Sequence, residues 1–293
     1  MTGVFGAGVV TVLEKMNIYD RIEAIYSASA GVMNGAYFLS HQTELGSSIY
    51  WENLNKGFIS LKGFWIGVWQ RFENRFIKKV DDGHLYDAIN TDYLMSVVEN
   101  QKVLDKQKII NSSIPFFVKL LNLDTHQMEF IDARRSDILN ILKAGVHIFP
   151  YVHGVIKIDG KRYVDAAIPE IIGIRTLVNR HPNTKIIVVM NSPKKRKLTY
   201  RPKNILEGKF MEWMFNDILL YPIFAYAEDR LKEDLKYIKN DPSIILICPP
   251  DDFTVRSRTT DVRKLIDAWK LGVSEGEKIA SMIIGDFSSN IVH

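Results

Sequence analysis

The feature that most constrains this chain is a run of small residues that joins an apolar segment to a helical pattern, within residues 22–38. The apolar segment predicts a buried strand, and the second half of the stretch has the spacing of a helix. Residues 27–31 between them read Ser-Ala-Ser-Ala-Gly, so the backbone can turn sharply there. Such a turn exposes a serine hydroxyl at a helix N-terminus, whose N–H groups favour an oxyanion. We therefore predict a nucleophile at Ser29, in a variant of Gly-x-Ser-x-Gly that has Ser27 in place of the first glycine and Gly31 as the second.

The composition narrows the class of protein. Among 293 residues, 46% are hydrophobic and 25% are charged, as in an ordinary globular protein, and the net charge of +4 gives no sign of a nucleic-acid binder. The single cysteine, Cys248, excludes internal disulfides and cysteine-rich metal sites. We find no apolar run of about 20 residues and no signal peptide. These features predict a cytoplasmic protein and leave open a peripheral contact with a membrane surface.

The order of elements predicts an α/β fold. The first eight residues are rich in glycine and lead directly into a helix, so the usual first strand is missing. A strand at 21–26 and a helix at 30–41 follow, which implies a parallel sheet with crossover helices. Asp159-Gly160 between two alternating runs indicates a hairpin at 155–164. Further strands are predicted at 114–123, 128–131, 185–190 and 244–247. We expect a mostly parallel central sheet flanked by helices.

Aromatic and basic residues gather in residues 50–80. This excursion is either a lid that touches lipid or a helical segment packed against the core. Later helices are predicted at 92–99, 137–144, 171–179, 210–226 with an interruption at Pro222, 228–239 and 261–283. Because no repeat or linker is visible, we predict a single domain over 1–293, with a helical C-terminal part at 205–293.

A serine nucleophile requires a base, and the histidines are poor candidates. In an α/β-hydrolase, the order along the chain is serine, acid, histidine. Only His181 and His293 follow Asp165, and His181 precedes a predicted strand, at the end opposite to the site. An aspartate can itself serve as the base when it is partly desolvated. Asp165 follows a strand and precedes two alanines, so it is either this base or an aspartate that caps a helix or turn.

Taken together, these motifs resemble those of the patatin-like phospholipases. The elbow at 27–31 is followed by Asn-Gly-Ala at 34–36, as is typical of that family. Asp165-Ala166-Ala167 is similar to the family's Asp-Gly-Gly or Asp-Gly-Ala turn, and it follows a hairpin in the same way. Residues 2–13 look like the end of the family's glycine-rich block. The resemblance covers roughly residues 1–190.

The resemblance implies a three-layer sandwich and a Ser–Asp dyad, with Ser29 as nucleophile and Asp165 as general base. It implies Gly3 and Ala30 as oxyanion donors, no metal or organic cofactor, and a phospholipid or other acyl-ester lipid as substrate. The chain departs from the family in its first residues, since Thr2 stands where an arginine is usual and the preceding glycines and strand are absent. We expect that Met1 is an internal residue of the natural protein. The alternative is a catalytically weak or inactive lipid-binding protein with an incomplete oxyanion hole.

Overall fold

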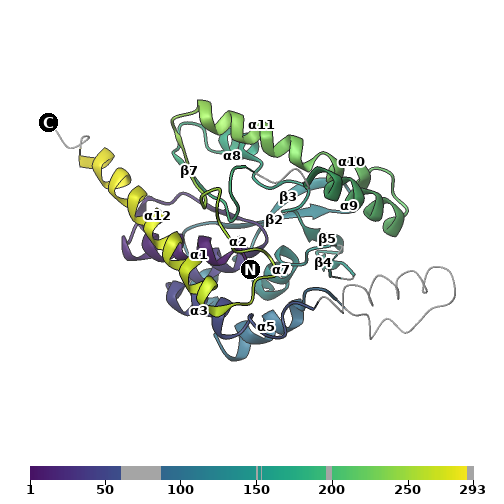
Figure 1. The fold of residues 1–293 in the computed structure, drawn as a ribbon, viewed down its shortest axis with the longest axis horizontal. Helices are drawn as coiled ribbons and strands as arrows, with labels where there is room; N and C mark the ends of the chain where they lie inside the picture. The colour runs from purple at the N-terminus through teal and green to yellow at the C-terminus, as the bar shows by residue number, and fades with distance from the viewer. Residues whose placement is uncertain (61–86, 150, 153, 196–199, 289–293) are drawn as a thin grey trace.

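The computed structural model describes residues 1–60, 87–149, 151–152, 154–195 and 200–288. It has an α/β fold in which helices lie on both sides of a mixed sheet (Figure 1). Most of the aromatic excursion predicted at 50–80 lies outside the described residues, as does His293.

Strand β2 (Phe116–Asn122) is the centre of the larger sheet. Along one edge it pairs over most of its length with the antiparallel strand β3 (Gln127–Asp132). Its other edge is shared by two strands that approach from opposite directions. The parallel strand β1 (Ile25–Ser27) takes the first half and the antiparallel strand β5 (Lys161–Asp165) takes the second. This division of one edge brings the ends of β1 and β5 together.

The prediction of a mostly parallel sheet is wrong. Strand β4 (Ile156–Ile158) is antiparallel to β5, and only the β1–β2 pair in this sheet is parallel. Two short hairpins, one of them turning at Asp159 (φ 51°) and Gly160 (φ 79°), make the β2–β3 and β4–β5 pairs antiparallel, because a tight turn cannot join parallel neighbours. A separate parallel pair is formed by β6 (Ile186–Val189) and β7 (Ile244–Ile247).

Most predicted helices are found near their expected positions. Before β2 the helices are α1 (Val4–Lys15), α2 (Ala30–Leu39), α3 (Thr43–Glu52), α5 (Thr91–Asn100) and α6 (Lys106–Ile110). After β3 they are α7 (Ile138–Gly145), α8 (Ile174–Arg180), α9 (Tyr200–Phe215), α10 (Leu220–Ala225), α11 (Ala227–Asn240) and α12 (Val262–Ser288). Helices α3 and α6 were not predicted, and the helix expected at 210–226 is replaced by α9 and α10, which begin at residues 200 and 220. The break before α10 lies at residues 216–219 and not at Pro222, which sits in the first turn of α10, where proline is tolerated.

The two faces of β2 contribute to different parts of the core. Phe116, Val118 and Leu120 pack in the cluster that includes α1, α2 and α7, whereas Leu121 packs against α9 and α10.

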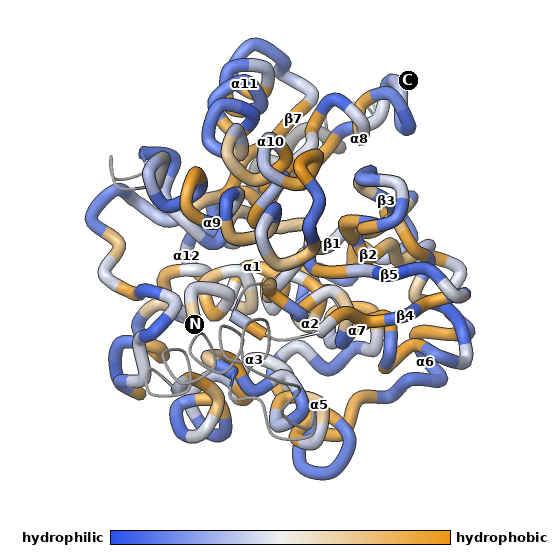
Figure 2. Tube along the Cα trace, turned by 90° about the vertical axis from the view of Figure 1, so that its right-hand side faces the viewer, coloured by the Kyte–Doolittle hydropathy of each residue, from blue (hydrophilic) through white to orange (hydrophobic). Residues whose placement is uncertain are grey.

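Helix α12 lies along α1, and a Cβ added at Gly8 would lie 2.2 Å from a carbonyl oxygen of α12, so glycine is required at this crossing. The trace is apolar around β2 and α7 and polar along much of α11 (Figure 2). Among the described helices, none combines the length and apolarity needed to span a bilayer.

Candidate functional site

Ser29 occupies the turn between β1 and α2, as the sequence predicts. It has φ 51° and ψ −132°, a region that a residue with a side chain rarely adopts. Holding a non-glycine residue there costs on the order of 1–3 kcal/mol, and such strain gathers at functional sites. Ser29 is the N-cap of α2, yet its hydroxyl does not cap the helix. The hydroxyl is therefore left for another partner.

The strand pairing brings Ser29 and Asp165 together. On the shared edge of β2, the last residue of β1, Ser27, lies opposite Val118, and the last residue of β5, Asp165, lies opposite Leu120. Two residues of strand separate these positions, which corresponds to roughly 7 Å. Because β1 and β5 run toward each other, the turn that follows β1 comes directly to the end of β5.

Asp165 is a buried carboxylate with a raised pKa. Its side chain is almost inaccessible to solvent, and burial raises the pKa to about 7. Oδ1 accepts a hydrogen bond of 2.9 Å from the N–H of Ala167, whereas Oδ2 has no hydrogen-bond partner in the described structure. The side chain and the backbone of Ser29 lie near enough to lower this pKa, although the pair does not reach ordinary hydrogen-bond geometry. Such loose contacts are common in a catalytic pair without substrate.

The N-termini of α1 and α2 lie side by side at Ser29. A Cβ added at Gly3 would lie 2.4 Å from the Cβ of Ala30, so the two predicted oxyanion donors come from neighbouring backbones. Asn34 fixes this junction, since its Nδ2 donates to the Gly3 carbonyl over 2.9 Å and its Oδ1 accepts from the Tyr50 hydroxyl over 3.1 Å. No hydrogen bond formed among the described residues uses the N–H of Gly3 or of Ala30. Both donors, at helix N-termini, are available to an anion.

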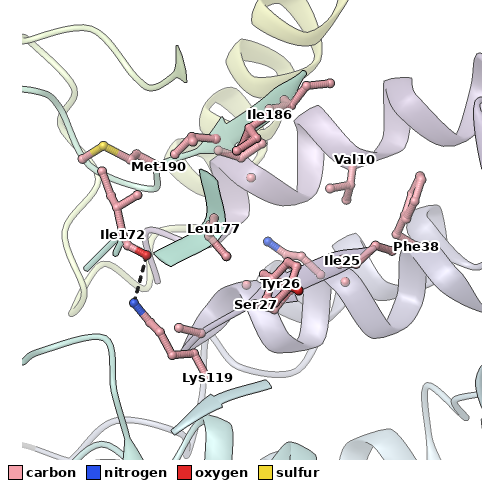
Figure 3. Close-up of a pocket in the computed structure, with 18 of the residues that line it drawn as sticks. Val10, Ile25, Tyr26, Ser27, Phe38, Lys119, Ile172, Leu177, Ile186 and Met190 are labelled. Carbon is pink, nitrogen blue, oxygen red and sulfur yellow. Dashed lines mark hydrogen bonds between the residues drawn. The ribbon is translucent and has the colours of Figure 1, made fainter. Parts of the chain in front are cut away.

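Lys119 is a buried residue of the site that the sequence analysis missed. It lies on β2 between the positions opposite Ser27 and Asp165, and its side chain is 4% exposed. Its Nζ donates to the carbonyl oxygens of Glu170 and of Ile172 (3.1 Å) and to the Glu170 carboxylate (3.4 Å), the Ile172 bond being the dashed line in Figure 3. These three acceptors match the three donors of an ammonium group.

The hydrogen bonds of Lys119, together with two from residues of α11, hold the segment that follows Asp165. We call residues 165–173 the Asp165 loop. Arg230 donates to the carbonyl of Pro169 over 2.8 Å, and Asp234 accepts from the N–H of Gly173 over 2.9 Å. Burial lowers the pKa of Lys119, and the Lys119 charge in turn lowers the pKa of Asp165. Lys119 thus both positions the loop and acts electrostatically on the carboxylate.

A cavity of about 590 Å³ adjoins this site (Figure 3). Ser29, Ala30, Gly31 and Ala167 border it where β1 ends, and Asn191 borders it where β6 ends. In open α/β sheets, ligands bind at the carboxyl ends of strands, so this end of the cavity suits a substrate. The remainder of its lining is mainly aliphatic and comes largely from α1, β1 with the segment before it, the Asp165 loop and β6.

The other predicted residues take supporting places. Ala166 is fully buried under the Asp165 turn, and the hydroxyl of Ser27 packs against Gly35. A Cβ added at Gly31 would meet no atom within 4 Å, so close packing does not explain that glycine. The described residues contain no group of three or more histidine, cysteine or acidic side chains that could hold a metal.

His181 is engaged away from Ser29. Its Nε2 lies 2.9 Å from the Tyr26 hydroxyl and its Nδ1 lies 3.2 Å from the Glu23 carboxylate. Both ring nitrogens thus have hydrogen-bonding partners, one on β1 and one just before it. This arrangement argues against a triad in which His181 is the base.

Comparison with known proteins adds no assignment, since no protein-family model matches the chain and no curated protein matches it in sequence. The geometry of the site therefore carries the functional argument.

Proposed function

We propose that this protein is a serine hydrolase of carboxylic esters, of the patatin-like type, that acts on acyl-ester lipids. The observation that carries the proposal is the strained Ser29 beside the buried Asp165. A strained residue persists only where the surrounding structure imposes it, and a carboxylate with a pKa near the working pH suits proton transfer. Each feature alone has a structural explanation, but together they form a nucleophile and its base.

In the proposed reaction, Asp165 accepts the proton of Ser29 while Oγ bonds to the ester carbonyl carbon. The N–H groups of Gly3 and Ala30 donate to the resulting oxyanion. The ester C–O bond then breaks, and the alcohol leaves with the proton held by Asp165. Water attacks the acyl-enzyme, Asp165 takes its proton, and the fatty acid departs as Ser29 recovers its hydrogen. No step requires a metal or an organic cofactor.

The substrate class rests on the apolar lining and on the resemblance. The cavity beside Ser29 is bordered mainly by aliphatic side chains, among them Val10, Leu13 and Ile22, which suit a hydrophobic ester. Phospholipids and other acyl-ester lipids have this character. Contact with a membrane surface during turnover is part of the proposal.

Ser29→Ala is the direct test. We expect it to abolish covalent labelling by a fluorophosphonate and to lower hydrolysis of 4-nitrophenyl butyrate by about a thousandfold or more. Mass spectrometry of the labelled peptide would locate the adduct. Ser96→Ala, at an exposed position on α5, is the matched control and should label normally. Equal labelling of Ser29→Ala would contradict the assignment.

The same experiment separates the hydrolase from the inactive lipid-binding alternative. If purified protein neither labels nor hydrolyses the ester, but still binds phospholipid vesicles, the non-catalytic function is supported instead.

A further inference from the structure

Two buried polar side chains lie where helices α1, α2 and α3 pack against one another (Figure 1). Asn34 on α2 is 7% exposed and Tyr50 on α3 is 6% exposed. The proposed mechanism assigns no step to either side chain. Burying an amide or a hydroxyl costs free energy unless it is hydrogen-bonded, and asparagine is a poorer helix former than alanine. Packing alone therefore does not explain a buried asparagine in the helix that follows Ser29.

Two successive turns of α2 contact the first turn of α1. Ala30 and Asn34 are four residues apart, so both lie on the same side of α2. Gly3 contacts both of them, since its Cα lies against the Cβ of Ala30 and its carbonyl accepts from Asn34 Nδ2 over 2.9 Å. One turn further along α1, a Cβ added at Gly6 would lie 3.2 Å from the same Nδ2. Because neither glycine has a side chain, the Asn34 amide can reach the backbone of α1.

Tyr50 fixes the orientation of the Asn34 amide from its other side. The Gly3 carbonyl can only accept hydrogen bonds, so the NH₂ group of Asn34 faces it and Oδ1 faces away. Oδ1 accepts a hydrogen bond of 3.1 Å from the Tyr50 hydroxyl. Burial raises the pKa of Tyr50, so the hydroxyl keeps its proton at neutral pH and remains a donor. The hydroxyl, the amide and the Gly3 carbonyl thus form one continuous chain of hydrogen bonds.

Other contacts hold the rest of α1. The Thr11 hydroxyl lies 3.3 Å from that of Ser47, and the Glu14 carboxylate accepts from the N–H of Thr43 over 3.0 Å. Both contacts join α1 to α3, roughly two and three turns along the helix from its first residues. The position of α1 as a whole therefore does not depend on Asn34, whose hydrogen bond acts on the first turn, beside Ser29.

We propose that Asn34 and Tyr50 are positioning residues for the oxyanion site. Tyr50 orients the Asn34 amide, and that amide holds Gly3 against Ala30, so that the two N–H donors keep the spacing that an oxyanion requires. Donors act strongly in a transition state when they are held in place before the reaction begins. This inference rests on the proposed hydrolase activity and identifies the side chains that preorganise its donors.

The test compares the wild type with Asn34→Ala and Tyr50→Phe in the hydrolysis of 4-nitrophenyl butyrate. A displacement of about 1 Å in a catalytic site can cost about a hundredfold in rate. We expect kcat to fall by about a hundredfold in Asn34→Ala and by about tenfold in Tyr50→Phe, which leaves the amide able to donate to Gly3. KM should change by less than about twofold, because the donors act on the transition state.

Inhibition by butyl trifluoromethyl ketone gives a second readout. Ser29 Oγ bonds to the ketone carbon, Asp165 takes the Ser29 proton, and the carbonyl oxygen becomes an oxyanion at the same site. The inhibition constant should rise in each variant by about the factor by which kcat falls. Poor folding would lower the amount of active protein without changing the affinity of the remainder, so this measurement separates positioning from a loss of fold.

Tyr19→Phe is the matched control. Tyr19 also donates its hydroxyl to α2, to the Phe38 carbonyl over 2.9 Å, near the end of the helix that is far from Ser29. Its removal should leave kcat and the inhibition constant unchanged. Equal losses in Tyr19→Phe and Tyr50→Phe would show a general effect on α2 and would overturn the proposal.

The remaining outcomes distinguish this inference from the hydrolase on which it rests. If Ser29→Ala abolishes hydrolysis but Asn34→Ala and Tyr50→Phe keep the wild-type kcat, or change KM alone, the positioning function is overturned and the hydrolase stands. Hydrolysis that survives in Ser29→Ala would overturn both.

Discussion

Strands β2 and β6 differ in how their edges are used. β2 pairs along both edges, and the residue between its two short partners is the buried Lys119. β6 pairs along one edge only, and its other edge borders the cavity. The difference separates two properties of the molecule. Where β1 and β5 meet on β2, strand pairing on this edge brings Ser29 and Asp165 together. Between β1 and β6, the backbone retains unused hydrogen-bonding capacity.

The largest expected effect lies in the fully paired region. Asp165→Asn removes the proposed base, so ester hydrolysis should fall by about a thousandfold or more, since loss of the acid in a related triad costs about ten-thousandfold. Asn also removes a buried charge. Because the pKa is about 7 in the folded protein and 3.8 ordinarily, the folded state binds the proton more tightly. The contribution of Asp165 to the stability of the folded protein is therefore greatest below about pH 4 and falls as the pH rises to 7, by about 4 kcal/mol.

The stability of Asp165→Asn should lack this dependence. Urea unfolding of both proteins at pH 4.5 and pH 8 would measure it. We expect the unfolding free energy of Asp165→Asn, relative to that of the wild type, to be higher at pH 8 than at pH 4.5. Parallel pH profiles for the two proteins would show that Asp165 does not titrate as proposed.

A smaller effect is expected from Lys119→Met. Removing one partner of a buried ion pair commonly costs about 3 kcal/mol or more, so this substitution on β2 should destabilise far more than Val189→Pro on the open edge of β6. It should also raise the pKa of Asp165, because the Lys119 charge lowers that pKa. Unfolding curves and the pH dependence of hydrolysis give the two readouts.

Lys119→Arg is the control for that substitution, since it keeps the charge while changing the geometry of the donors. If Lys119 acts only as a structural anchor, the pH midpoint of hydrolysis should stay unchanged in Lys119→Met despite the loss of stability.

The smallest expected effect is on the free energy of unfolding and arises from backbone strain at Ser29. Ser29→Gly relieves the positive φ and should be more stable than Ser29→Ala by about 1 kcal/mol, although both lack the nucleophile. Both variants remove the hydroxyl, so their difference isolates the backbone contribution. Equal unfolding free energies would mean that the turn is not strained at Ser29.

Most local elements could be predicted from the sequence, because apolar periodicity and turn residues act at short range. The elbow at Ser29 and the Asp159-Gly160 hairpin are found where they were expected. The parallel sheet was predicted wrongly because β1 and β5 pair with the same edge of β2 from opposite directions. Which distant strands pair, and in which direction, cannot be recognised from the sequence of either strand.

Lys119 shows what the site analysis missed. A lone lysine within the apolar run at 116–122 was a usable signal, because a buried charge needs partners. Its acceptors, however, lie about fifty residues away in the Asp165 loop and include backbone carbonyls, which carry no sequence information. The cavity bordered by β1 and β6 likewise depends on which strands pair.

The pH dependence of fluorophosphonate labelling tests the central claim most directly. If Asp165 takes the proton of Ser29, the labelling rate should rise with pH through a midpoint near 7 and should be low and flat in Asp165→Asn. A wild-type rate that is independent of pH between about 5 and 9, and equal to that of Asp165→Asn, would contradict the account.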